Sequence, residues 1–174
     1  MDKIHLQIER NILVSALSAA SRLVSGRELL PILTNYFVQF NSLGNAGVTA
    51  TNLNISVIAP MFNVRILSPG EGRFLMPASV LPAVKNMRPG EILDITFYNE
   101  TNKLNIESSD VKLSWATLSH TDYPSINITE KEPASTFTIA QAGTLLDTLD
   151  FIGECIAKPQ HKLGIPGVYI SCRS

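Results

Sequence analysis

Cysteine is scarce in this chain, and no apolar run is long enough to cross a membrane. Only Cys155 and Cys172 occur among 174 residues, which fits a reducing compartment and excludes a disulfide framework. No stretch reaches the roughly 18 uninterrupted apolar residues expected of a membrane span. Residues 1–6 have no long apolar segment behind their charges, so no signal peptide is expected. These absences predict a cytoplasmic protein without membrane contact.

An excess of charge of either sign is also missing. Lysine and arginine total 14, aspartate and glutamate total 15, and the formal net charge is -1. Nucleic-acid binders often have a clear basic excess, so the total gives DNA binding no support, although a local basic patch stays possible. With 45% hydrophobic and 17% charged residues, the chain has the composition of a globular core rather than of long disorder.

Residue patterns for catalysis or metal binding are weak. There is no phosphate-binding loop of the Gly-x-x-x-x-Gly-Lys type. His120 and Asp122 have no nearby nucleophile or orienting partner in the sequence. Cys155, His161 and Cys172 match no close pair of metal ligands. We therefore expect no catalytic residues, no metal and no cofactor. No set of residues in the sequence supports a small hydrolase.

The most informative stretch runs from Arg27 to Pro60. Pro31 cannot lie inside a helix, so it ends whatever precedes it. The residues from Tyr36 to Phe40 favour a strand, and the polar run 41–47 favours a turn before two further strands. This stretch therefore predicts a break, a long strand, a tight turn and two more strands.

The flanking segments repeat one order of elements. Residues 4–8 alternate as a half-buried strand, and a helical apolar period follows from Glu9. Later, a strand at 73–76 leads into a helix at 77–87 that tolerates Pro82 only if it begins near Ser79. Strands at 92–97, 103–107 and 111–116 form a meander. The sequence thus predicts an α+β fold in which a strand, a helix and several strands occur twice. The apolar helix positions of the first copy are Ile12, Leu13, Ala16, Leu17, Ala20, Leu23 and Val24.

The rest of the chain predicts a linker and an incomplete second domain. We place the first domain at 1–118, the linker at 119–134 and the second domain at 135–174. Tyr123-Pro124 is expected to dock against the first domain. A third copy of the unit begins at 137–139, with a helix whose apolar face includes Leu145, Leu149 and Ile152, and a strand follows at 167–171. An unpaired strand there predicts disorder, swapping or dimerisation.

Two motifs in this order resemble one family. The run from Arg27 to Asn35 reads Arg-x-x-Leu-Pro-Ile-Leu-x-Asn, and the run from Val48 to Ser56 reads Val-Thr-Ala-Thr-x-Leu-x-Ile-Ser. Together they resemble the first domain of the bacterial DNA polymerase III beta subunit, the sliding clamp. The resemblance implies a DNA-clamp fold, with helices on one face of antiparallel sheets. It also implies a non-catalytic ring of head-to-tail chains around duplex DNA, with polymerase and clamp-loader subunits as further partners and a homo-oligomeric state.

The sequence departs from the family pattern where charge matters. Asn52 and Asn54 stand where the family usually has acids, and Ser79-Val80 replaces a basic pair. The family's basic loop is Ser108-Ser109-Asp110 here, which leaves Lys112 alone. The region that completes the second domain and the third domain of the family has no counterpart in the 174 residues. A clamp-fold protein-interaction module that no longer forms a DNA ring is therefore the alternative.

The resemblance implies DNA-facing residues in the first domain. Arg27 lies in the loop where the family places such an arginine, and a solvated loop arginine is the alternative. Arg10 and Arg22 lie on the polar face of the helix expected to line the hole, where ordinary solvation is the alternative. Lys85 and Arg88 can attract phosphate, or can simply be favourable cations at a helix C-terminus.

The second domain contributes one more basic cluster. Lys158, His161 and Lys162 occupy the loop where the family's second domain meets DNA, although a short basic loop is often only solvated. The third helix opposes this prediction, because Asp147, Asp150 and Glu154 would repel phosphate if they faced the hole.

Overall fold

The computed structural model describes residues 3–24, 30–41, 43–124 and 142–153. The chain divides into two compact units, Met1–Asn127 and Ile128–Ser174. Each unit is considered by itself. The finer division at residues 118 and 134 stays a prediction.

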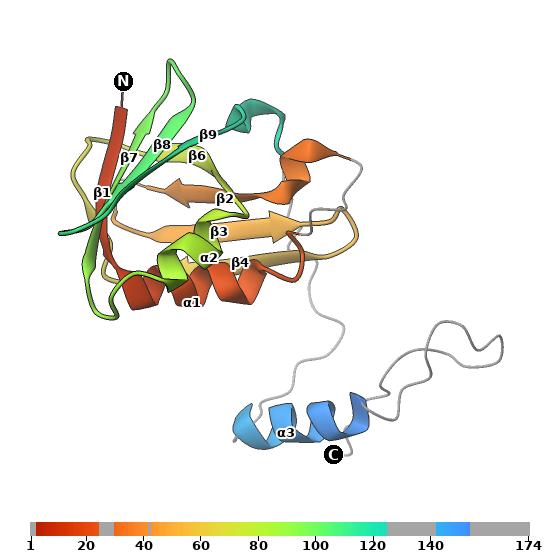
Figure 1. The fold of residues 1–174 in the computed structure, drawn as a ribbon. Coiled ribbons are helices and arrows are strands. Elements are labelled where there is room, and N and C mark those ends of the chain that lie inside the picture. Colours follow the sequence, from red (N-terminus) through yellow and green to blue (C-terminus); the bar gives the residue numbers. More distant parts are fainter. Residues whose placement is uncertain (1–2, 25–29, 42, 125–141, 154–174) are drawn as a thin grey trace. The chain divides into compact units, whose positions relative to one another are not determined.

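Two antiparallel sheets form the first unit (Figure 1). The five-stranded sheet has the order β5-β1-β7-β8-β9, and the four-stranded sheet has the order β4-β3-β2-β6. The predicted α+β class and the predicted meander at the end of the unit are confirmed. In chain order the strands are β1 Lys3–Glu9, β2 Asn35–Phe40, β3 Ala46–Thr51, β4 Ser56–Met61, β5 Arg65–Ile66, β6 Gly72–Pro77, β7 Ile92–Tyr98, β8 Lys103–Glu107 and β9 Lys112–Ala116.

The two predicted copies of the unit exchange their first strands. β1 belongs to the first copy but pairs along its length with β7 of the second copy. β6 opens the second copy but pairs with β2 of the first copy. Neither sheet can therefore form from one half of the unit alone. Local sequence patterns predict the strands but contain no signal for this exchange.

Two helices accompany the sheets, α1 at Arg10–Ala20 and α2 at Val80–Lys85. α1 packs against β3, β4 and α2 and buries the apolar side chains of its central turns. The prediction extended this helix through Val24, which is wrong, because the chain leaves the helix after Ala20 in hydrogen-bonded turns. Val24 is nevertheless buried. Pro82 lies in the first turn of α2, as predicted.

The main core lies between the sheets and the helices. Phe74 of β6 and Phe97 of β7 stack with ring centroids 5.3 Å apart, which joins one sheet to the other. Both rings are fully buried, as are Leu13 and Leu17 of α1. Trp115 of β9 is only partly buried and packs against this core. The two sheets therefore share one continuous apolar interior.

The Leu-Pro-Ile-Leu-x-Asn motif forms a 3-10 turn, η1 at Pro31–Thr34, followed directly by β2. The buried Asn35 amide donates to the carbonyl oxygens of Pro31 at 3.0 Å and of Ile32 at 3.3 Å. The Thr34 hydroxyl also donates to the Pro31 carbonyl oxygen at 2.7 Å, and the Asn35 backbone N–H donates to the Ile32 carbonyl oxygen. The Asn35 amide therefore adds a second donor to each of these two carbonyls. The motif thus ends the turn and begins the strand through hydrogen bonds among its own residues.

The segment after β9 folds back over the four-stranded sheet. It contains the short turn η2 at His120–Asp122. Tyr123, which follows η2, stacks on Phe37 of β2 with centroids 5.0 Å apart and rings inclined by 10°. Its hydroxyl donates to the carbonyl oxygen of Thr49 at 3.5 Å, and burial raises the pKa of Tyr123 to about 12. The predicted docking of Tyr123 against the first domain is confirmed.

The described part of the second unit is the helix α3, Ala142–Gly153. It includes the predicted apolar positions, and Leu146 and Phe151 are exposed. The predicted strands at 137–139 and 167–171 lie outside the described residues.

A polar cluster joins β1 to β7 and gives the domain one acid-sensitive contact. Gln7 Nε2 donates to Asp94 Oδ1 at 2.9 Å, and His5 Nε2 lies 3.0 Å from the same oxygen. The Gln7 hydrogen bond, followed by the contact with His5, holds the pKa of Asp94 below its ordinary value. A carboxyl with a lowered pKa stabilises the folded state above its unfolded pKa and loses this contribution as pH falls through the folded value.

We expect Asp94→Asn to lower the free energy of unfolding by less than about 1 kcal/mol at neutral pH, because the site is partly exposed and screened. The difference in free energy of unfolding from wild type should persist down to about pH 4. Below that pH it should shrink, because the Asp94 carboxyl becomes protonated first in the unfolded chain and then, at lower pH, in the folded protein. Urea unfolding of both proteins between acidic and neutral pH measures this difference. A difference that stayed constant far below pH 4 would contradict the assignment.

Candidate nucleic-acid interface

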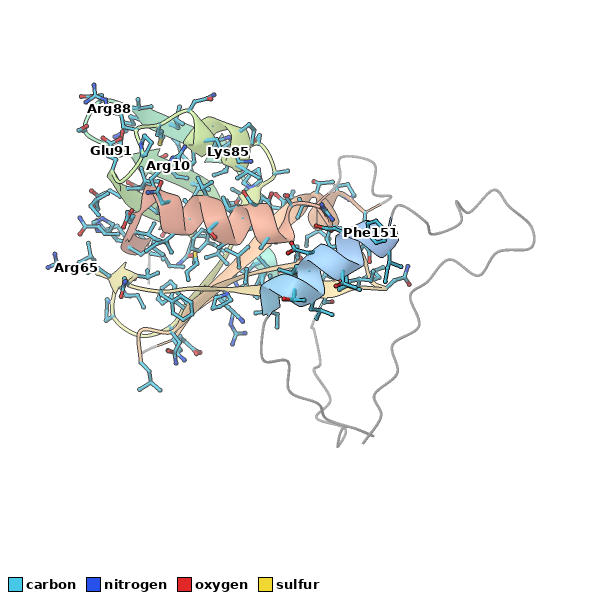
Figure 2. The ribbon with its side chains drawn as sticks, turned by 90° about the horizontal axis from the view of Figure 1, so that it is seen from below. Arg10, Arg65, Lys85, Arg88, Glu91 and Phe151 are labelled. Carbon is cyan, nitrogen blue, oxygen red and sulfur yellow. The ribbon has the colours of Figure 1, made fainter. Side chains whose placement is uncertain are left out.

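The exposed surfaces of α1 and α2 form the candidate interface. The two helices are in contact, and Figure 2 shows Arg10, Lys85 and Arg88 close to the region where α2 ends. α1 has no acidic residue in its sequence, and its exposed positions Asn11, Ser15 and Ala19 are small or amide side chains. A surface of this composition leaves room for a phosphate backbone to approach closely.

Arg10 is bound to the end of α2. Its Nε donates to the carbonyl oxygen of Val84 at 3.1 Å, and its Nη2 donates to the carbonyl oxygen of Lys85. The backbone N–H of Arg10 also donates to the backbone carbonyl oxygen of Glu91 at 2.8 Å. The last carbonyls of a helix lack partners within the helix, and a cation there also interacts favourably with the helix dipole. Arg10 is therefore a structural link between the helices, which leaves its predicted DNA contact untested.

Removing this link should destabilise the domain. We expect Arg10→Gln to lower the free energy of unfolding by about 1 to 2 kcal/mol, because two carbonyls lose their charged donor. Arg22→Gln is the matched control, since Arg22 is exposed in the turn after α1 and should change stability by less than about 0.5 kcal/mol. Denaturant unfolding compares the two variants. Equal effects would show that the link to α2 contributes nothing.

The other predicted cations differ in their surroundings. Lys85, the last residue of α2, and Arg22 are exposed, and neither forms an ion pair within the described ranges. Arg88 pairs with Asp110, with Nη2 3.0 Å from Oδ2. Arg27, Lys158, His161 and Lys162 lie outside the described residues, so the structure brings together only Arg10, Lys85 and Arg88.

Acidic groups accompany these cations. The Ser109 hydroxyl and the Ser109 backbone N–H, the latter at 3.0 Å, donate to Glu91 Oε1. These bonds hold the pKa of Glu91 below its ordinary value, so the carboxylate stays ionised beside Arg88. Asp110 and Glu91 therefore offset much of the positive charge near the end of α2. Sequence reasoning noted the loss of a basic loop at 108–110 but missed that this loop would pair with Arg88, because the pairing depends on how β8 and β9 place the loop.

The turn after β3 explains why asparagine is accepted at position 52, one of the two positions where the family resemblance implies an acid. Asn52 Oδ1 accepts hydrogen bonds from the backbone N–H groups of Asn54 at 3.1 Å and Ile55 at 2.8 Å. An aspartate oxygen accepts the same bonds, so asparagine preserves the turn while removing a charge.

The described residues were also compared with the arrangements that metal binding, catalysis and membrane crossing require. Among them, no group of three histidine, cysteine or acidic side chains is placed to hold a metal ion. His120 and Asp122 both lie in η2, with no described nucleophile hydrogen-bonded to either side chain. No helix within the described part is long and apolar enough to cross a membrane.

Comparisons with known proteins agree on one family. The family model for the DNA polymerase III beta subunit, N-terminal domain, matches residues 4–127. The beta sliding clamp of Vibrio cholerae is 28% identical over 147 residues, which cover 83% of this chain and 38% of that relative. The beta sliding clamp of Vibrio harveyi is 26% identical over 147 residues, covering 83% of this chain and 97% of that sequence.

Solved structures show the same fold. The beta subunit of Streptococcus pyogenes DNA polymerase has a TM-score of 0.70 at 19% identity, covering 92% of this chain and 41% of that one. The DNA polymerase III subunit beta of Pseudomonas aeruginosa has a TM-score of 0.67 at 20% identity, covering 91% and 41%. Most of these relatives are thus matched over less than half of their length. The chain belongs to the DNA polymerase III beta subunit family, through its N-terminal domain.

Proposed function

We propose that this chain acts as a non-catalytic sliding-clamp subunit, which holds a replicative polymerase on duplex DNA without reading base sequence. The family match over residues 4–127 is the observation that carries the proposal. A single chain covers only 38% of the Vibrio cholerae clamp, so a ring would need several copies or further domains. Polymerase and clamp-loader subunits are the expected partners, and the cytoplasm is the expected location.

In this proposal the α1–α2 surface faces DNA through phosphate attraction. Arg22 and Lys85 are its exposed cations without a described acidic partner. Phosphate contacts release condensed counterions, so binding that depends on them weakens as salt rises. Few cations contribute, and the expected affinity is accordingly low.

We expect duplex binding by the wild-type chain to fall with salt, with a log–log slope that becomes shallower by about 1 for each phosphate contact removed. The Arg22→Gln and Lys85→Gln substitutions remove one cation each. Fluorescence anisotropy of a labelled duplex over a range of salt concentrations gives the slopes.

Arg65→Gln is the matched control, because Arg65 is an exposed arginine of β5 that Figure 2 shows apart from Lys85 and Arg88. It removes the same charge from a different place. If Arg65→Gln reduced the slope as much as the other two, net charge rather than the α1–α2 surface would govern binding.

A clamp-fold interaction module is the second candidate, and the charge balance near α2 favours it. The Arg88–Asp110 pair and the ionised Glu91 reduce attraction for phosphate. The free side of β9 offers backbone groups for pairing with another chain, and its exposed residues Lys112, Ser114 and Ala116 are not bulky apolar ones. Absence of duplex binding even at low salt would support this module and contradict the clamp.

A further inference from the structure

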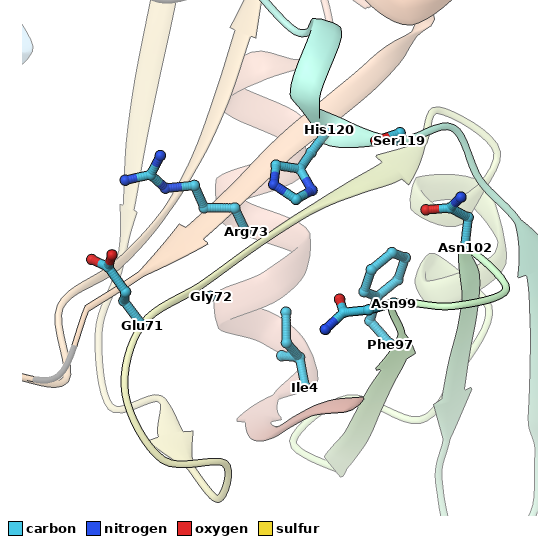
Figure 3. Close-up of a pocket in the computed structure, with 9 residues that line it drawn as sticks. All are labelled: Ile4, Glu71, Gly72, Arg73, Phe97, Asn99, Asn102, Ser119 and His120. Atoms are coloured by element: carbon cyan, nitrogen blue, oxygen red, sulfur yellow. The ribbon is translucent and has the colours of Figure 1, made fainter. Parts of the chain in front are cut away.

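A cleft with a polar wall and an apolar floor lies away from the candidate DNA surface. It opens between β6 and the turn that joins β7 to β8, and the segment that follows β9 bounds it on another side (Figure 3). Its volume is about 370 Å³. The candidate cations of α1 and α2 do not contribute to its lining.

The floor is built by buried side chains that cannot easily move. Ile4 and Phe97 line the cleft, although only 4% and 1% of their surfaces are exposed. Gly72 is required beside them, because a Cβ there would lie 2.4 Å from Cζ of Phe40 and 2.9 Å from Cδ1 of Ile4. Phe97 is also fixed by its stacking on Phe74. The floor is therefore a rigid apolar surface.

The walls supply hydrogen-bond donors. Arg73, His120 and Asn102 line the cleft. Figure 3 shows the His120 ring between the other two, with Asn102 on one side and, on the other, the Arg73 side chain extending away from the ring toward the rim of the cleft. Within the described part of the chain, none of these three side chains forms a hydrogen bond or ion pair that uses its donors. Glu71 is the one acidic residue of the lining, and no ion pair joins it to Arg73.

We propose that this cleft binds an organic carboxylate attached to a short apolar group. The planar guanidinium of Arg73 matches a carboxylate in geometry and charge, and His120 and Asn102 can donate to its oxygens. The apolar group would cover Ile4. An inorganic anion would leave the floor uncovered, and an uncharged apolar molecule would leave the donors unpaired. Small-ligand sites usually combine an apolar lining with a few hydrogen-bonding groups.

Two probes that differ only in charge test this site. N-acetyl-leucine has the carboxylate, and N-acetyl-leucinamide replaces it with a neutral amide. In ¹⁵N-resolved NMR titrations of the whole chain, we expect N-acetyl-leucine to shift the signals of residues 71–73 and 119–120 saturably. We expect N-acetyl-leucinamide to bind at least about tenfold more weakly than N-acetyl-leucine, because it lacks the charged acceptor of the hydrogen bonds. A free-acid tripeptide Ala-Ala-Leu distinguishes the source: tighter binding assigns a peptide C-terminus, and weaker binding assigns a free small acid.

Arg73→Gln should weaken N-acetyl-leucine binding about tenfold, whereas Arg65→Gln should leave it unchanged. His120→Gln provides a second variant if Arg73→Gln perturbs the fold, and unchanged spectra outside the cleft show that each variant is folded. The proposal is overturned if acid and amide bind equally, if inorganic phosphate binds as tightly as N-acetyl-leucine, or if no saturable shift occurs at these residues.

Discussion

Replacing Asn35 with aspartate is expected to cost about 3 kcal/mol or more of folding free energy, the larger of two strong effects that follow from the structure. Asn35 is 5% exposed, and its amide nitrogen donates to the carbonyls of Pro31 and Ile32. Aspartate has nearly the same shape but no donor when ionised. It would place a buried negative charge against two carbonyl oxygens, or protonate at the cost of a strongly raised pKa. Urea unfolding at neutral pH measures the loss.

Asn45→Asp is the matched control for this substitution. Asn45 is exposed in the turn between β2 and β3, so the same chemical change should alter stability by less than about 0.5 kcal/mol. The loss in Asn35→Asp should also become smaller as pH falls, because a protonated carboxyl can again donate. Similar effects of the two substitutions would mean that the amide of Asn35 does not hold the η1 turn.

Tyr123→Ala is expected to lower the free energy of unfolding by about 3 kcal/mol, in the range found for removal of a buried aromatic ring. The ring is 8% exposed and stacks on Phe37, so alanine would uncover the outer face of β2 and β3. The segment from Ser119 to Tyr123 would lose its main contact with the sheet. Denaturant unfolding gives the magnitude, and faster proteolysis after residue 118 would show where the structure loosens.

Tyr123→Phe separates the ring from its hydroxyl. The bond from this hydroxyl to the Thr49 carbonyl is long, at 3.5 Å, so phenylalanine should cost less than about 1 kcal/mol. If Tyr123→Phe cost as much as Tyr123→Ala, the hydrogen bond rather than the stacked ring would anchor the segment.

Local patterns in the sequence predict much of this fold because each depends on neighbouring residues. Pro31, the alternation in β1 and the turn residues between β7, β8 and β9 act within a few positions of themselves. The exchange of β1 and β6 between the two halves depends on contacts far apart in the sequence, such as the stacking of Phe74 on Phe97. Such contacts leave no periodic signal, and for this reason the halves were predicted as successive units.

The candidate interface was less predictable than the fold. The sequence identified Arg10 on a polar helix face and Arg88 near a helix C-terminus as candidate cations. It could not show that Arg10 binds the carbonyls that end α2 or that Arg88 pairs with Asp110. Both interactions join segments separated by more than twenty residues. The charge available to DNA therefore depends on tertiary pairing, which composition does not report.

Topological retention on DNA tests the proposed clamp function most directly. The chain is incubated with a nicked circular plasmid and with the same plasmid linearised, and both samples are filtered by size at high salt. A clamp that encircles DNA stays on the circle and slides off the linear ends, so we expect retention on circular DNA only. Equal retention on both forms, or none on either, would contradict encirclement and leave the interaction module as the function.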